Sequence, residues 1–355
     1  METRSLEFLK TLLDTPGPSG FEAQVARLWR REAESFADRV WGDVSGNSFA
    51  LLGPGGEPRV MLAGHIDEIG LMVTHVDDQG FVYFSAIGGW DAEILVGQRV
   101  RVLARDGAVS GVIGKKAIHL QDKEAREKPS KIKDLWIDIG AADGKQAKGL
   151  VRVGDAAVLD AQLLELPSGR IVSRSLDNRI GAFVVLEALR LLAKKRPAAE
   201  VIAVATSQEE IGYPGGGGAR TSAFGLEPKV ALVVDVTHAT DYPTAEKKEQ
   251  GDHPLGSGPV LHRGSAINPV VQERLVESAE KEKIPYSLEA SPRSTGTDAD
   301  AIFGARSGIA TALVSVPNRY MHSPNEMVAL DDLDHAARLI AAFVRGVRPD
   351  DDFVP

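Results

Sequence analysis

Apolar segments that end in acidic or histidine side chains constrain the fold of this chain more than any other feature. Val-Met-Leu-Ala-Gly and Val-Ala-Leu-Val-Val are two such segments. The polar residues that follow the apolar segments are His65, Asp67, Glu209, Glu210, Asp235 and His322. Short β-rich segments that alternate with helical ones predict a mixed, mostly parallel sheet flanked by helices. Ligands of such sheets gather beyond the carboxyl ends of the strands, so we expect these residues to meet at one edge.

Another acid, Asp177, stands in Ser-Leu-Asp-Asn-Arg at the start of a helical pattern over 178–195. We expect its carboxylate to reach the same edge of the sheet. The combined set offers two imidazoles and several carboxylates, which suit zinc or cobalt, with manganese also possible.

The sequence changes character between residues 71 and 166, where short alternating runs and many glycines replace the helical period. Asp106-Gly107 separates two of these runs and is a strong hairpin signal. We therefore predict a small β-barrel or sandwich at 71–166, inserted into an α/β domain formed by 1–70 and 167–355. Outside the insert, helices are predicted over 4–14, 21–38, 178–195, 268–283 and 331–346, and strands over 48–52, 58–64, 200–206, 230–236 and 309–316.

Composition limits the classes of function. A chain of 355 residues with a net charge of −9 and no concentrated basic stripe does not suit a nucleic-acid partner. There are no cysteines, so disulfides and thiolate ligands are excluded. The N-terminal residues lack the pattern of a signal peptide, and no run is apolar and long enough to cross a membrane. We expect a cytoplasmic protein that binds no membrane.

Asp177 is a candidate bridging ligand because a carboxylate has two oxygens. Two-metal hydrolases hold their cations roughly 3.5–4 Å apart, a spacing that one carboxylate can span. His65 and Asp235 would complete the ligand set of one metal, and Glu210 and His322 that of the other. Each metal would keep a free position for water or substrate, as catalytic sites require.

Glu209 and Glu210 are neighbours, and neighbours on a strand point to opposite faces. Both can reach one site only where the chain turns, and residues 211–215 (Ile-Gly-Tyr-Pro-Gly) are predicted to supply that turn. One glutamate can then bind metal while the other acts as general base on the attacking water. Asp67 is expected to accept the second ring N–H of His65 and so fix its tautomer.

Each of these residues has a simpler interpretation when taken alone. An aspartate after a strand is usually a turn or cap residue, and a Glu-Glu pair usually lies on the surface. The combination is more specific than its parts. The remaining histidines are predicted to be structural or exposed and to bind no metal: His75, His119, His238, His253, His262 and His335.

The motifs together resemble the M42 family of di-metal aminopeptidases. They are Gly-His-Ile-Asp-Glu-Ile-Gly, Ser-Leu-Asp-Asn-Arg, Gln-Glu-Glu-Ile-Gly, Val-Val-Asp-Val-Thr-His and Arg-Tyr-Met-His-Ser-Pro. The resemblance implies a zinc-peptidase type fold, removal of N-terminal residues from short peptides in the cytosol, and a tetrahedral dodecamer built from dimers. It also implies that Asp177 bridges the metals, that Glu209 is the base and that Asp67 orients His65. The segment Arg293–Asp298 resembles a family segment near the substrate pocket, without roles for its side chains.

Three other functions compete with this interpretation. A deacylase of N-acyl amino acids would use similar two-metal chemistry. An endoglucanase, a label that family members have carried, needs two carboxylates roughly 5–10 Å apart. Glu209 and Glu210 could serve, but the other ligands would be unexplained, and four tryptophans make no evident sugar-stacking groove. A non-enzymatic assembly protein would need no convergent ligands.

Because small β domains present strand edges, we also expect 71–166 to form a dimer interface.

Overall fold

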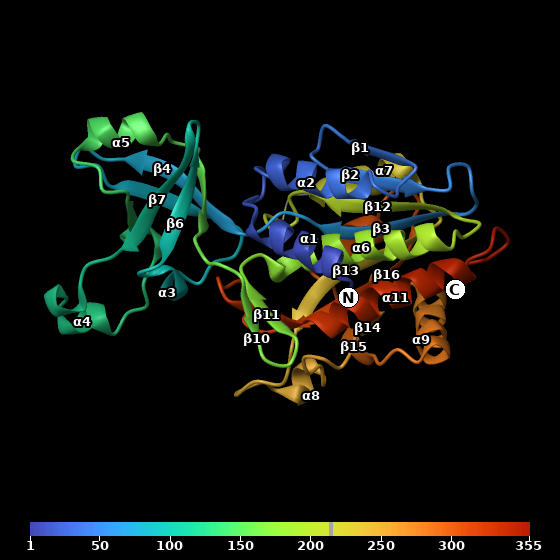
Figure 1. Ribbon diagram of the computed structural model, residues 1–355. Coiled ribbons are helices and arrows are strands. Elements are labelled where there is room, and N and C mark those ends of the chain that lie inside the picture. The colour runs from blue at the N-terminus through green and yellow to red at the C-terminus, as the bar shows by residue number, and fades with distance from the viewer. Residues whose placement is uncertain (213–215) are drawn as a thin grey trace.

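A mixed eight-stranded sheet forms the centre of the larger of two bodies that lie side by side in Figure 1. The computed structural model describes residues 1–212 and 216–355. Four neighbouring strands run parallel, in the order β12 (Glu200–Thr206), β3 (Arg59–His65), β13 (Val230–His238) and β16 (Ala310–Asn318). Their nearly continuous apolar sequences reflect burial on both faces of the sheet.

Antiparallel pairings flank this parallel centre. On one side β2 (Ser48–Leu52) pairs with β12, and β1 (Arg39–Gly42) forms the edge. On the other side β14 (Val260–Gly264) pairs antiparallel with β16. The edge strand β15 (Ser287–Ser291) then runs parallel to β14.

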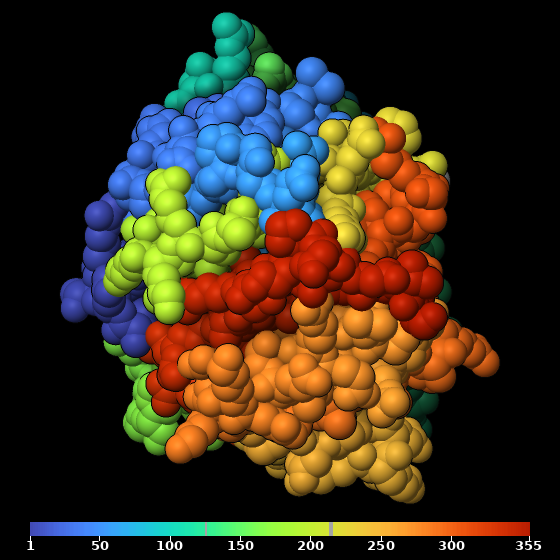
Figure 2. Space-filling model, turned by 90° about the vertical axis from the view of Figure 1, so that its right-hand side faces the viewer, coloured from blue at the N-terminus to red at the C-terminus, as the bar shows by residue number. Residues whose placement is uncertain are grey.

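Helices cover the sheet, and the most buried is α6 (Leu176–Lys194), which packs on β3, β12 and β13. It also contacts α1 (Thr3–Asp14) and α11 (Leu330–Gly346). Asn268 begins α9 by accepting the N–H of Val271, followed by a proline at the first position. In Figure 2, the red segment that contains α11 crosses the face above the orange segment of α9, its packing partner. The remaining helices of this body are α1 (Thr3–Asp14), α2 (Ala23–Ala33), α7 (Gly217–Leu226), α8 (Lys247–Gln250), α9 (Pro269–Glu282), α10 (Asp298–Phe303) and α11 (Leu330–Gly346).

The smaller body is a closed antiparallel barrel with its own apolar core, which includes Leu71, Val100 and Ile137. Its strands, in order around the barrel, are β4 (Gly70–Val76), β5 (Val82–Ile87), β8 (Trp136–Asp138), β7 (Gly107–Gly114), β6 (Arg99–Ala104) and β9 (Ala156–Leu159). Short helices decorate it: α3 (Ala92–Leu95), α4 (Lys123–Arg126), α5 (Gly144–Leu150) and the 3₁₀ turns Ile118–Leu120 and Ile132–Asp134. Closure leaves no free strand edge on the barrel. The edge-pairing reason for expecting a dimer interface here is therefore wrong, although the interface itself stays a prediction.

A third, three-stranded antiparallel sheet joins distant parts of the chain near the site. It contains β10 (Leu164–Leu166), β11 (Arg170–Ser173) and β17 (Glu326–Ala329). The register places Ser173 opposite Glu326. This pairing brings the segment before Asp177 next to the segment after His322.

The predicted fold class is confirmed: a mostly parallel sheet is flanked by helices, and a small barrel is inserted into it. The sequence did not reveal the edge strands β14 and β15 or the three-stranded sheet. No helix in the described ranges is long and apolar enough to span a membrane.

Candidate active site

The ends of the parallel strands bring His65 and Asp235 together. Ala63 of β3 pairs with Val233 of β13, so the residues two positions further lie side by side. His65 and Asp235 are 1% and 4% exposed, and the His65 Nε2 lies 3.9 Å from Asp235 Oδ1. Both residues thus lie at the predicted edge of the sheet.

Asp177 lies between two imidazoles. Its Oδ1 is 3.3 Å from His65 Nε2, and its Oδ2 is 3.4 Å from His322 Nε2. Asp177 stands in the first turn of α6, where its own backbone is still extended. One carboxylate therefore presents each of its oxygens to a different histidine.

Two groups of possible metal ligands share Asp177. In one, ligand atoms of His65, Asp177 and Asp235 all lie within 4.8 Å of one another, and in the other Asp177, Glu210 and His322 do so. Glu210 Oε2 is 3.2 Å from His322 Nε2, while the buried Glu210 Oε1 has no hydrogen-bond partner among the described residues. Carboxylate and imidazole donors around a shared carboxylate fit a pair of divalent cations.

Glu209 belongs to neither group. Its Oε2 lies 3.8 Å from His65 Nε2, and its side chain lines the same cavity as the two groups. It is thus near the candidate ligands without being one of them.

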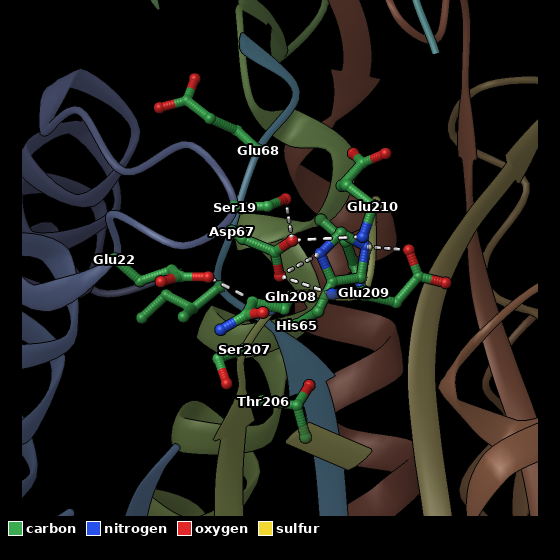
Figure 3. Close-up of polar contacts among 12 residues, drawn as sticks. Ser19, Glu22, His65, Asp67, Glu68, Thr206, Ser207, Gln208, Glu209 and Glu210 are labelled. Atoms are coloured by element: carbon green, nitrogen blue, oxygen red, sulfur yellow. Dashed lines mark hydrogen bonds and ion pairs between the residues drawn. The ribbon is translucent and has the colours of Figure 1, made fainter. Parts of the chain in front are cut away.

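Asp67 organises the neighbourhood of His65 and of the two glutamates (Figure 3). Its Oδ2 accepts the Ser19 hydroxyl at 2.6 Å and the Glu210 N–H at 3.2 Å, and its Oδ1 accepts the Glu209 N–H at 3.2 Å. The same Oδ1 lies 3.5 Å from His65 Nδ1, which is long for a hydrogen bond. Asp67 therefore faces the predicted ring nitrogen of His65. It also accepts the backbone N–H groups of Glu209 and Glu210, and the sequence did not predict this second role.

The turn that delivers both glutamates begins earlier than expected. Gln208 has a φ of 60°, and its N–H is donated to Glu22 at 3.2 Å. The Gly212 N–H is donated to the carbonyl of Glu209 at 3.0 Å, which closes the turn. Of the segment 211–215 that was predicted to form the turn, residues 213–215 lie outside the described residues.

Burial dominates the electrostatics of the site, and the crowding of acids adds to it. Burial, with the nearby charges of Asp235 and Asp298, raises the pKa of Glu209 to about 10, and burial with Asp177 raises the pKa of Glu210 to about 7. Hydrogen bonds to Asp177 and Glu210 raise the pKa of His322 to about 11. Burial alone would raise the pKa of Asp177, but the two imidazoles hold it below its usual range. Without cations, the acids and imidazoles share protons, which divalent cations would displace.

Two further buried acids, Glu326 and Asp298, lie near the site. Glu326 was not singled out from the sequence, and Asp298 ends the segment Arg293–Asp298, whose side chains were given no roles. Glu326 accepts the backbone N–H groups of two candidate ligands, Asp177 and His322. Asp298 accepts the hydroxyl of Thr206. Burial raises the pKa of Asp298 to about 6. A single acid outside a recognisable motif, such as Glu326, carries no sequence signal, so only the fold identifies it.

Glu68 serves the scaffold beneath the site. Its carboxylate forms ion pairs with Arg174 and, at 2.7 Å, with Arg179, and it accepts the Gly17 N–H at 2.9 Å. Glu68 and both arginines are buried. These contacts tie the loop before α2 and the start of α6 to the end of β3.

None of the other histidines belongs to a ligand group in the described part of the chain. His253 and His262 are buried and contact serine hydroxyls. From the segment Arg293–Asp298, Thr295, Gly296 and Thr297 line the cavity that contains the ligand groups.

Comparison with known proteins places the chain in a family. The M42 glutamyl aminopeptidase family matches residues 46–339. A lysyl aminopeptidase of Pyrococcus furiosus is 36% identical over 353 residues, which cover 98% of this chain and 99% of the relative. A TET aminopeptidase from a marine sediment archaeon of the Thaumarchaeota shares the fold with a TM-score of 0.91 at 34% identity, covering 96% of each chain. The TET1 peptidase of Pyrococcus horikoshii, which can assemble into a tetrahedron or a large octahedral shell, has a TM-score of 0.84 at 32% identity and covers 97% of this chain and 100% of its own.

These matches and the fold define a peptidase. The chain belongs to the M42 glutamyl aminopeptidase family. The His and Asp residues gathered at the ends of β3, β13 and the start of α6 could bind a metal ion.

Proposed function

We propose that this protein is a two-metal aminopeptidase that removes N-terminal residues from short peptides. The observation that carries the proposal is the position of Asp177, whose two oxygens face the imidazoles of His65 and His322 separately. A carboxylate in this position can bridge two cations. We assign His65 and Asp235 to one cation and Glu210 and His322 to the other, with zinc or cobalt the preferred metals and manganese an alternative.

The bound cations would polarise the scissile carbonyl and lower the pKa of the attacking water. Glu209, which is free of both ligand groups, takes the proton from this water and then gives it to the leaving amine. Asp67 orients the ring of His65 through Nδ1 and holds the backbone N–H groups of Glu209 and Glu210. Asp67 thereby fixes the position of the proposed base, Glu209, relative to the proposed ligand, Glu210.

The alternatives explain less of the site. A glycosidase would use Glu209 and Glu210 but would give no role to the two imidazoles around Asp177. A deacylase of N-acyl amino acids would need the same ligands, so the test must compare blocked and free amines. A non-enzymatic assembly protein would have no use for the shared carboxylate.

We further propose a cytoplasmic location and a closed shell of many subunits, a tetrahedral dodecamer built from dimers. The support is the likeness to the TET1 peptidase, whose shells are tetrahedral or octahedral. Within such a shell, the domain formed by 71–166 would form dimer contacts, and 1–70 with 167–355 would carry catalysis. Closed symmetric assemblies are common among soluble enzymes.

One experiment tests the proposed reaction. The protein is freed of metal with a chelator, and hydrolysis of aminoacyl p-nitroanilides is followed as zinc, cobalt or manganese is added back. We expect activity to return with metal and to require a free N-terminal amine. Equal hydrolysis in the presence of chelator, or a preference for N-acyl amino acids, would contradict the proposal.

A further inference from the structure

The cavity that contains the ligand groups continues to a second group of polar residues. Its volume is about 440 Å³, and beyond Asp235 it is lined by Thr237, His262 and Glu289. Asp235 and Thr237 point to the same face of β13, about 6–7 Å apart along the strand. The carboxylate of Glu289, which is hydrogen-bonded to Thr237, therefore lines the same cavity beyond Asp235.

Glu289 enters the cavity from the edge strand β15. Ser287, Glu289 and Ser291 face inwards, whereas Leu288, which is 51% exposed, faces solvent. The Thr237 hydroxyl donates a hydrogen bond to Glu289 Oε2 at 2.7 Å, and this contact fixes the carboxylate in the cavity. Within the described residues, Glu289 Oε1 accepts no hydrogen bond.

The neighbouring imidazoles do not hydrogen-bond to this carboxylate. His253 Nε2 and His262 Nε2 each lie 3.8 Å from Glu289 Oε2. Both ring nitrogens of His262 contact serine hydroxyls, at 3.0 and 2.8 Å, and burial lowers its pKa. No lysine or arginine forms an ion pair with Glu289 in the part of the chain that the structure describes. A half-buried carboxylate with a free oxygen is thus open to a cation in the cavity.

The order of the strands indicates which part of a peptide meets Glu289. β12, which leads to Glu209, lies on one side of β3 and β13, and β15, which carries Glu289, lies on the other. Glu209 gives its proton to the leaving amine, so the leaving peptide lies on the β12 side. The side chain of the first residue is then directed towards β15.

We propose that Glu289 selects peptides whose first residue is basic, lysine or arginine. This rests on the proposed function, because it assumes cleavage at the ligand groups. The ammonium or guanidinium group would donate a charge-assisted hydrogen bond to the free carboxylate oxygen. An apolar first residue would leave the Glu289 carboxylate unpaired and desolvated, and an acidic one would repel it.

The test uses the metal-loaded full-length protein and the p-nitroanilides of lysine, leucine and glutamate. We expect wild-type kcat/KM to be highest for lysine and lowest for glutamate. Glu289→Gln should lower the Lys:Leu ratio of kcat/KM by about 10- to 100-fold, because a charged hydrogen-bond partner becomes neutral. The exposed Glu282→Gln on α9 is the matched control and should leave the ratio unchanged.

Two further measurements keep the test decisive. Thr237→Val removes the hydroxyl that fixes Glu289 and should lower the same ratio by about 3- to 10-fold, even if Glu289→Gln folds poorly. The peptides Lys-Ala-Ala and Ala-Lys-Ala distinguish the first residue from the second, and only the first should respond to Glu289→Gln. An unchanged Lys:Leu ratio in both variants, or an effect only on Ala-Lys-Ala, would overturn the assignment of Glu289. A wild-type enzyme that prefers leucine would also overturn the assignment of Glu289, but the aminopeptidase proposal would stand. If no free-amine substrate were hydrolysed, both proposals would be overturned.

Discussion

Glu326 accepts the backbone N–H of Asp177 through its Oε2 at 2.9 Å. Its other oxygen, Oε1, accepts the backbone N–H of His322 at 2.9 Å. Glu326 begins β17, and its pairing with Ser173 of β11 brings these segments together. Burial and the nearby charge of Asp177 raise the pKa of Glu326 well above its usual range, although both N–H groups oppose this shift. One buried side chain thus sets the relative position of two candidate ligands.

We predict that Glu326→Gln weakens metal binding at the group formed by Asp177, Glu210 and His322. The amide NH₂ would face a backbone N–H, and an unsatisfied buried donor costs about 1–3 kcal/mol. Metal analysis by mass spectrometry should show a fall from two cations towards one per chain, with reduced turnover that excess metal partly restores. The exposed Glu282→Gln serves as control. If Glu326→Gln kept both cations at wild-type affinity, Glu326 would not position these ligands.

Substitutions of Glu209 and of His322 should distinguish a loss of catalysis from a loss of metal binding. Glu209→Gln keeps the size and polarity of the side chain but removes the base, so turnover should fall by roughly 10²–10⁴-fold while both metals remain. His322→Ala should instead lose metal, because it removes a ligand. Kinetics and metal content measured on the same preparations check both expectations. The reverse outcome, with metal lost from Glu209→Gln and kept in His322→Ala, would show that the roles are wrongly assigned.

Metal affinity should rise with pH. Without cations, burial and hydrogen bonding raise the pKa of Glu210 to about 7 and the pKa of His322 to about 11. Both groups must lose their protons to bind metal, so protons compete with the cations and affinity falls as the pH is lowered. Titration calorimetry of zinc binding between pH 6 and 8, in buffers of different ionisation enthalpy, should detect proton release. Binding without proton release would contradict the proposed ligands.

The sequence revealed the strand ends that carry the candidate ligands, because each apolar run is long and stops at a polar residue. His65 and Asp235 are adjacent because β3 and β13 are parallel neighbours and end at the same edge of the sheet. The supporting acids could not be predicted. Glu326 and Glu289 reach the site through β17 and β15, whose short and partly polar sequences give weak strand signals. Closure of the barrel depends on pairing of β4 with β9, more than 80 residues apart, which local patterns do not encode.

Glu68 should contribute strongly to stability through its two buried arginine partners. Glu68→Gln would leave Arg174 and Arg179 without their anion, and loss of one partner of a buried ion pair costs about 3–5 kcal/mol. Burial opposes the charge of Glu68, but the two arginines lower its pKa below the usual value of 4.5. Its stabilising contribution is therefore complete above pH 4.5 and is lost as the pH falls through the lowered value.

Urea denaturation of wild type and Glu68→Gln, from pH 7 to pH 3, measures this contribution. The difference in unfolding free energy should be largest at neutral pH and should shrink towards pH 3. The exposed, matched Glu282→Gln should show no such difference. A constant difference across the pH range would mean that the charge of Glu68 is not what stabilises the fold.

Assembly should depend on apolar side chains on the outside of the barrel rather than on strand edges. Val112, Ile118, Leu120 and Val153 are 47%, 60%, 70% and 67% exposed in the single chain. Exposed apolar side chains can form an interaction surface when they lie close together, and Ile118 and Leu120 belong to one 3₁₀ turn. We predict that the Ile118→Asp and Leu120→Asp double variant reduces the particle mass measured by light scattering, because it places charge in the contact. Val44→Asp, which changes an exposed residue before β2 in the larger body, should leave the mass unchanged. A wild-type protein that is a fully active monomer at working concentration would contradict the proposed shell altogether.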